Sequence, residues 1–127
     1  MHFKQESIMK SKEVFLKCIE LDPHHTHAYV ALAFVYNVHG FQQEAIKICK
    51  ECKEHNKDFF GQFRMWAFAL FKKGDIPKAI KKIKKAILHY PKDADNWVIW
   101  GLIMRTVGNY ESALQKFEKA HKLDKDN

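Results

Sequence analysis

The sequence contains little of what turns, disulfides or membrane spans require. Its 127 residues include only five Gly and three Pro, too few turn formers for a small all-β protein, whereas 46% hydrophobic residues is too apolar for a disordered chain. The longest apolar run, 28–36, is far shorter than the roughly 20 residues of a membrane-spanning helix. The odd count of three Cys favours reduced thiols and a cytoplasmic location. We therefore expect one helical domain.

Motifs for catalysis and cofactor binding are also missing. None of the three serines lies in a nucleophile elbow, and the chain has no Gly-rich phosphate loop or metalloprotease motif. The carboxylates fall mostly in turns and on outer helical faces, where water solvates them. We expect no enzymatic activity and no cofactor.

A 34-residue repeat organises the chain. Gly40, Gly74 and Gly108 are separated by this interval, and each is followed five residues later by Ala. The same register aligns large residues (Tyr29, Phe63, Trp97; Leu32, Trp66, Trp100), small ones (Ala33, Ala67, Gly101) and, after the glycine, Cys49, Ile83 and Phe117. Each unit has one set of apolar and small residues at helical spacing before its glycine and a second set after it. This pattern predicts a helix, a turn and a second helix. The small residues are expected where the two helices of a unit cross.

At these positions the chain resembles the tetratricopeptide repeat family, whose units show the same order of large and small residues and often close with Pro, as Pro91 closes the second unit. The resemblance implies an all-α fold: a right-handed superhelix of stacked antiparallel helix pairs, with about three and a half repeats. The expected single domain, 1–127, comprises a half-repeat helix at 8–23 and repeats at 26–59, 60–93 and 94–127.

In this family the first helix of each unit lines a concave groove in which partners usually bind. Carried over by register, the groove consists of Val30, Phe34, Val38, Arg64, Met65, Phe68, Phe71, Lys72, Val98, Ile99, Leu102 and Arg105. These residues are mainly apolar with a basic fringe, and they lack the Lys, Asn and Arg clamp of the chaperone-binding subclass. The groove therefore favours a peptide or an amphipathic helix with hydrophobic anchors and some acidic residues. The alternative is that these side chains pack against one another in a tight superhelix.

Basic residues concentrate in the second unit. Net charge is +7, and Lys78, Lys81, Lys82 and Lys85 form a ridge of helical spacing. The ridge is interpreted mainly as a solvated outer face, because no arginine and no interleaved aromatic residue accompanies it. The alternative is a basic module that docks on nucleic acid or another anionic surface, although the composition of the ridge disfavours nucleic acid.

Two further clusters have structural interpretations. Cys49 and Cys52 form a CxxC, but they align with Ile83 and Ala86 and are expected to be buried as small hydrophobic residues. His24, His25 and His27 lie together in a loop, and no Cys or acidic cluster with ligand spacing completes a metal site. We therefore expect no metal.

The function that the sequence favours is a protein-interaction scaffold that binds a protein or peptide partner in its groove. A third alternative is an assembly subunit that self-associates through the open ends of its repeat array.

Overall fold

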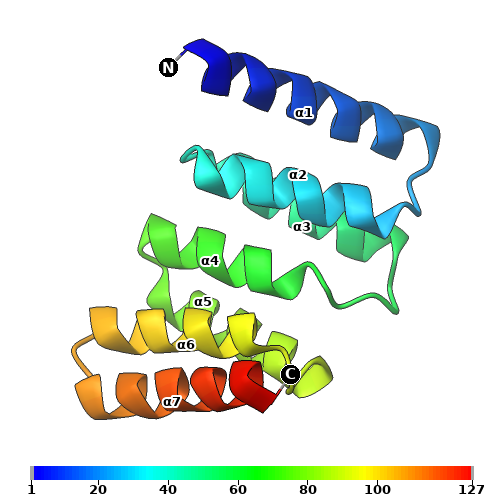
Figure 1. Ribbon diagram of the computed structural model, residues 1–127. Helices are drawn as coiled ribbons and strands as arrows, with labels where there is room; N and C mark the ends of the chain where they lie inside the picture. The colour runs from blue at the N-terminus through cyan, green and yellow to red at the C-terminus, as the bar shows by residue number, and fades with distance from the viewer. Residues whose placement is uncertain (1, 127) are drawn as a thin grey trace.

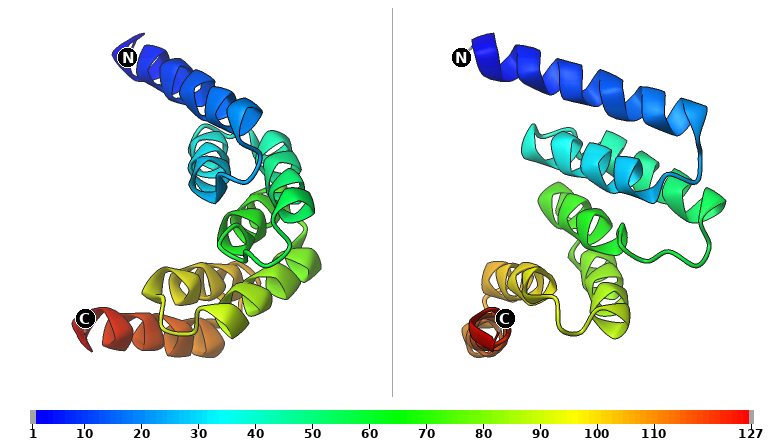
Figure 2. Two further views of the ribbon diagram at one scale, coloured as in Figure 1. Left: turned by 90° about the vertical axis from the view of Figure 1, so that its right-hand side faces the viewer. Right: turned by 45° about the vertical axis from the view of Figure 1, so that its right-hand side comes forward.

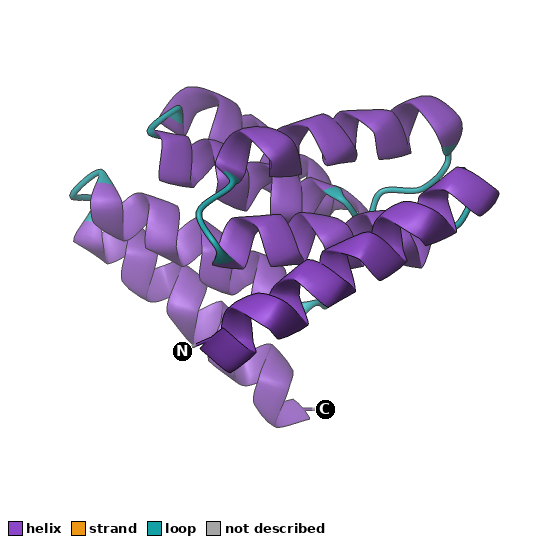
Figure 3. Cartoon of the chain, turned by 90° about the horizontal axis from the view of Figure 1, so that it is seen from above, coloured by secondary structure: helices purple, strands orange, loops and turns teal. Residues whose placement is uncertain are grey.

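The computed structural model describes residues 2–126, with side chains from residue 10 onward, and these residues form seven helices and no strand (Figure 3). The helices are α1 (His2–Leu21), α2 (Thr26–Val38), α3 (Gln42–His55), α4 (Phe63–Lys73), α5 (Ile76–His89), α6 (Ala94–Thr106) and α7 (Tyr110–Asp126). Antiparallel pairs stack from α1 to α7 as an all-α superhelix (Figure 1), which confirms the predicted fold class.

The repeated glycines end the first helix of each unit. Gly40, Gly74 and Gly108 have φ values of 81°, 93° and 87°, a left-handed conformation that residues with a Cβ rarely adopt. The next helix begins within two residues of each glycine. Side-chain oxygens of Asp75 and Asn109 accept hydrogen bonds from backbone amides in the first turns of α5 and α7, at 3.4 and 3.2 Å. Local sequence thus sets these turns.

Residue sizes are matched where the two helices of the third unit cross. A Cβ placed on Gly101 of α6 would lie 2.5 Å from the ring of Phe117 in α7, so that only glycine fits without a shift. The equivalent positions hold Ala67 with Ile83 in the second unit, and Ala33 with Cys49 in the first. The largest side chain on the second helix, Phe117, thus stands opposite the smallest residue on the first, and the two alanines stand opposite smaller side chains, as expected for interiors packed to near-crystalline density.

Helix α4 starts later in its unit than α6 does. Asp93 caps α6 by accepting a hydrogen bond from the amide of Asp95 at 3.1 Å, whereas Phe59 occupies the equivalent position before α4 and offers no side-chain acceptor. Gly61, which follows, disfavours helix and lies against the Phe59 ring. The segment 59–62 is therefore not helical, and a turn at 61–62 leads into α4. The first helix of the chain, α1, begins at His2, whereas the predicted half-repeat helix begins at residue 8.

The stack is curved. Figure 2 shows α2, α4 and α6 along the inside of a C-shaped arc and α3 and α5 along its outside. Within the described chain, helices contact only adjacent members of the array: sequence neighbours, together with α2 and α4, and α4 and α6. The large side chains of one continuous core, including the fully buried Tyr29 and Phe63, lie between the layers.

The last unit has an uncovered apolar face. Leu114 is 57% exposed and Tyr110 is 71% exposed, whereas Ile46, which occupies the position of Leu114 in the first unit, is only 5% exposed. Helix α3, which carries Ile46, packs against α4 of the following unit, whereas no further unit follows α7 in the described chain. Self-association through this end stays a prediction.

Candidate functional site

One wall of the proposed groove is the exposed stripe of α2. Phe34 and Val38 are 56% and 57% exposed, and the half-buried Val30 precedes them at the same helical spacing. The buried residues of α2 are on its other faces, and the helix packs against α1, α3 and α4. Helix α2 runs along the inside of the arc (Figure 2), and this exposed stripe belongs to the proposed groove. Aromatic and aliphatic side chains left this exposed are available to a partner.

The floor is formed by α4. Met65, Phe68 and Phe71 are half-buried, and the first and last of these pack against the core. The rings of Phe68 and Phe71 lie 6.2 Å apart, and the Lys72 amine lies 5.6 and 6.0 Å from their centroids. The floor is joined to the α2 wall by Asn37, a buried side chain whose Nδ2 donates to the carbonyl of Met65 at 3.0 Å. Part of the apolar surface that was predicted to bind a partner thus packs within the protein itself.

The opposite wall is α6. Val98 is 36% exposed, whereas Ile99 and Leu102 are half-buried, and Ile99 packs against the core. Arg105 is exposed in the last turn of the helix. The exposed apolar residues of the groove set, Phe34, Val38 and Val98, therefore belong to α2 and α6, whereas the apolar residues that α4 contributes are all half-buried.

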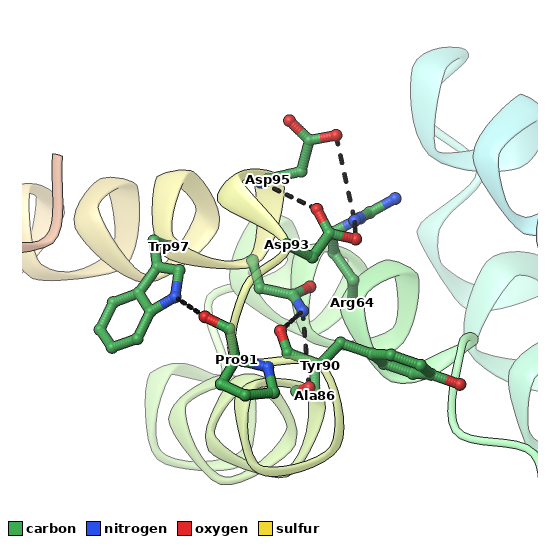
Figure 4. A network of polar contacts seen from close by, with 8 residues as sticks. Arg64, Ala86, Tyr90, Pro91, Asp93, Asp95 and Trp97 are labelled. Carbon is green, nitrogen blue, oxygen red and sulfur yellow. Dashed lines mark hydrogen bonds and ion pairs between the residues drawn. The ribbon is translucent and has the colours of Figure 1, made fainter. Parts of the chain in front are cut away.

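Arg64 was predicted to be one of the basic residues that border the groove, but in the structure it is paired with an acidic residue. Its Nη1 lies 2.8 Å from the Asp93 carboxylate and 4.0 Å from that of Asp95 (Figure 4). These carboxylates balance the guanidinium charge and fix its orientation. The remaining basic groups of the groove, Lys72 and Arg105, lie near the C-terminal ends of their helices, while Asp93 and Asp95 lie at the start of α6. The groove therefore has a basic edge and an acidic edge.

A cavity of about 350 Å³ adjoins the ion pair at the acidic edge. It is lined by Thr26, His27, Val30, Phe59, Phe60, Gly61, Arg64, Ala86, Tyr90, Asp93 and Asn96. Asn96 donates to the Tyr90 carbonyl at 3.2 Å, and the Trp97 indole donates to the Pro91 carbonyl at 2.8 Å (Figure 4). These bonds hold the α5–α6 connection and thereby one side of the cavity.

The lysine ridge is not uniformly a solvated face. Lys78 and Lys81 are exposed, and Lys78 pairs with Asp75 at 3.6 Å. By contrast, Lys82 and Lys85 are half-buried against aromatic rings of α4: the Lys82 amine lies 3.9 Å from the Trp66 centroid. The prediction concerned the outer face of α5, whose sequence contains no Phe, Tyr or Trp; the rings come from the neighbouring α4, where Phe63 and Trp66 are buried.

The cysteines are buried as predicted. Cys49 and Cys52 are both 0% exposed, and burial raises the pKa of Cys49 far above its ordinary value and that of Cys52 to about 11. His24 contacts the carbonyl of His55 at 3.0 Å, and His25 Nδ1 caps α2 by accepting from a backbone amide at 3.2 Å. Among the side chains described, no group of three or more His, Cys, Asp or Glu residues is placed to hold a metal.

Sequence reasoning missed two contributions from adjacent units. Asp93, which binds Arg64, comes from the connection before α6, and Lys53, whose amine lies 6.0 Å from the Phe63 centroid, comes from α3. Both contacts could have been found by comparing the charged residues of each unit with the residues of the next unit, rather than within each helix alone. None of the helices described is both long and apolar enough to cross a membrane.

Comparison with known proteins supports the fold. No family model and no curated protein sequence matches the chain. Solved structures do match. A crystal structure of MamA has a TM-score of 0.75 at 19% identity, with 94% of this chain and 70% of that chain covered. For MamA from Desulfovibrio magneticus RS-1, residue 41 to the end, the TM-score is 0.77 at 16% identity, with coverages of 98% and 70%. At these identities the likeness shows the fold: this chain has the all-helical architecture of the MamA structures.

Proposed function

We propose that the chain is a protein-interaction module that binds a peptide or an amphipathic helix in the concave groove. The observation that carries the proposal is the pair of exposed apolar walls, Phe34 and Val38 on α2 and Val98 on α6, on either side of the half-buried floor of α4. Apolar anchors spaced along one face of a helical or extended partner would be buried there. The proposal does not include a chaperone carboxylate clamp, because the positions where the Lys, Asn and Arg residues of that clamp would lie hold Val30, Phe34, Met65, Asp95 and Ile99.

The charges give the bound partner a direction. Arg64 is balanced by Asp93, so acidic residues of the partner should lie toward Lys72 and Arg105. A basic or polar group should lie toward Asp95, whose side chain is 76% exposed. The cavity beside Arg64 would receive one side chain of moderate size.

Selection from a displayed library of random peptides tests the proposal. Peptides that bind the wild-type chain should carry spaced apolar anchors and acidic residues, and they should lose binding to Phe34→Asp/Val98→Asp. Leu88→Asp/Leu114→Asp is the matched control, because these residues are 75% and 57% exposed on α5 and α7, outside the groove set. Circular dichroism checks that both variants remain helical. Selected peptides that bind the groove variant as tightly as the wild type would contradict the proposal.

A second selection tests the direction. With Arg105→Glu, the selected peptides should change from acidic to basic residues at one end while they keep their apolar anchors. An unchanged charge pattern would show that the basic edge takes no part in recognition.

A further inference from the structure

On the outer side of the arc, lysines from two helices gather around two rings of α4. The lysine cluster consists of Lys50 and Lys53 of α3 and Lys81, Lys82 and Lys85 of α5. Around the Phe63 ring, the amines of Lys85, Lys82 and Lys53 lie 5.1, 5.5 and 6.0 Å from the centroid. The Lys82 amine also lies 3.9 Å from the Trp66 centroid. The fold thus brings ammonium groups from separate helices close together.

These positive charges have no acidic partner in the described part of the chain. The ion pairs found there involve Lys17, Arg64 and Lys78, and none of them includes a member of the cluster. Burial lowers the pKa of Lys82, and the charges of the other four lysines lower it further. Aromatic faces attract ammonium groups, but they carry no net charge and leave the mutual repulsion in place.

The other units provide an internal comparison. In the third unit, Lys116 lies over Trp100 at 4.1 Å, in the same register as Lys82 over Trp66. Across that border, however, the positions of Lys53 and Lys81 are taken by Ile87 and Gln115. In the first unit, the positions of Lys82 and Lys85 are taken by Ile48 and Glu51. A lysine over a Trp ring therefore recurs in the second and third units, and among the side chains described the cluster of five lysines lies between α3 and α5.

We propose that the lysine cluster binds a ligand that carries several phosphate groups close together, such as a polyphosphate chain or a phosphoinositide headgroup. Phosphate oxygens would supply the missing negative charge, and a lysine ammonium binds phosphate as a point charge without a fixed orientation. Recognition of nucleic acid bases fits less well, because Phe63 and Trp66 are 1% and 6% exposed and the cluster contains no arginine. The lysines of the cluster belong to α3 and α5, which run along the outside of the arc, whereas the groove residues belong to α2, α4 and α6 along its inside (Figure 2).

Titration with sodium tripolyphosphate at about 0.15 M salt, an ionic strength that screens scattered surface charges, tests the proposal. The test variant is Lys50→Gln/Lys53→Gln, which removes two exposed members of the cluster from α3. The matched control is Lys119→Gln/Lys122→Gln, which removes the same charge at the same spacing from exposed positions of α7. We expect saturable binding to the wild type, a loss of about tenfold or more in the test variant, equivalent to about 1.4 kcal/mol, and less than about twofold in the control.

Vesicles distinguish the two sources of phosphate. Phosphatidylcholine vesicles with and without phosphatidylinositol bisphosphate are compared by flotation, with the same two variants. Phosphoinositide-dependent flotation that Lys50→Gln/Lys53→Gln abolishes would assign the site to a lipid headgroup, and tripolyphosphate binding without flotation would assign it to a soluble polyphosphate. Equal losses in both variants would attribute binding to net charge and overturn the proposal. Failure of the folded wild type to bind either probe would overturn it as well.

Discussion

The size matching between Gly101 and Phe117 leads to a prediction that a double-mutant cycle can test. Gly101→Ala places a methyl group 2.5 Å from the Phe117 ring, and this overpacking should cost about 1–3 kcal/mol. Glycine inside a helix is itself about 1 kcal/mol less favourable than alanine. The single substitution should therefore change the free energy of unfolding by between about zero and a loss of about 2 kcal/mol.

The second substitution of the cycle, Phe117→Ile, removes the ring that crowds a methyl group at position 101. Phe117→Ile reproduces the Ala67 and Ile83 pair of the second unit. In that background, Gly101→Ala should recover its full helix propensity and stabilise the chain by about 1 kcal/mol. The expected coupling between the two sites is therefore about 1–3 kcal/mol in favour of the double variant, although Phe117→Ile alone should be destabilising through loss of buried apolar volume.

Urea unfolding measures all four proteins. Circular dichroism and tryptophan fluorescence should report coincident transitions, and m values should not change. If Gly101→Ala stabilises the wild type and the Phe117→Ile variant equally, the coupling is zero and the size-matching explanation is refuted.

Three further predictions concern buried or capping groups. Gln62 is 0% exposed, and its side-chain Oε1 and Nε2 have no hydrogen-bond partner in the described chain. Gln62→Met should therefore raise the free energy of unfolding, measured in urea, by about 1–2 kcal/mol. A loss of stability would indicate that the amide is hydrogen-bonded. Asp93 both caps α6 and binds Arg64, so Asp93→Ala should lower the thermal midpoint and reduce the free energy of unfolding by about 1–2 kcal/mol. Asp95 is more distant from Arg64, so Asp95→Ala should reduce it by less than about 0.5 kcal/mol. Similar losses in the two variants would contradict this assignment. Burial raises the pKa of Cys52 from 9.0 to about 11, so the folded state holds this proton after the unfolded thiol has lost it; stability should therefore fall as pH rises from 9 to 11, and Cys52→Ala should reduce the slope.

The sequence was sufficient for the fold class because the determining interactions are local or periodic. Gly74 and its equivalents set the turns through their own φ angles, and the small residues at Gly101 and Ala67 recur at the interval that brings the two helices of a unit together. Such features depend on a residue and its near neighbours in the chain.

The details of the groove and the outer face depend on how adjacent units are tilted. The contact of Arg64 with Asp93 and the approach of Lys53 to Phe63 join residues of different units, and the curvature of the stack determines these distances. The late start of α4 shows another limit, because repeat register alone gives Phe59 and Asp93 the same position although only Asp93 can cap a helix. Periodicity aligns positions and does not state which side chains meet across a unit border.

Contacts restricted to adjacent helices give the arc a mechanical property. Nothing in the described chain ties α1 or α2 to α6 or α7, so the opening between the two walls is set by the sum of small angles at each junction. A slight rotation at the α2–α4 junction, where the Asn37 amide holds the Met65 carbonyl, would be amplified at the far end of the arc. The compliance of the arc is therefore the sum of the compliances of its junctions, so that the separation of α2 and α6 can change with little change in any single contact between adjacent helices.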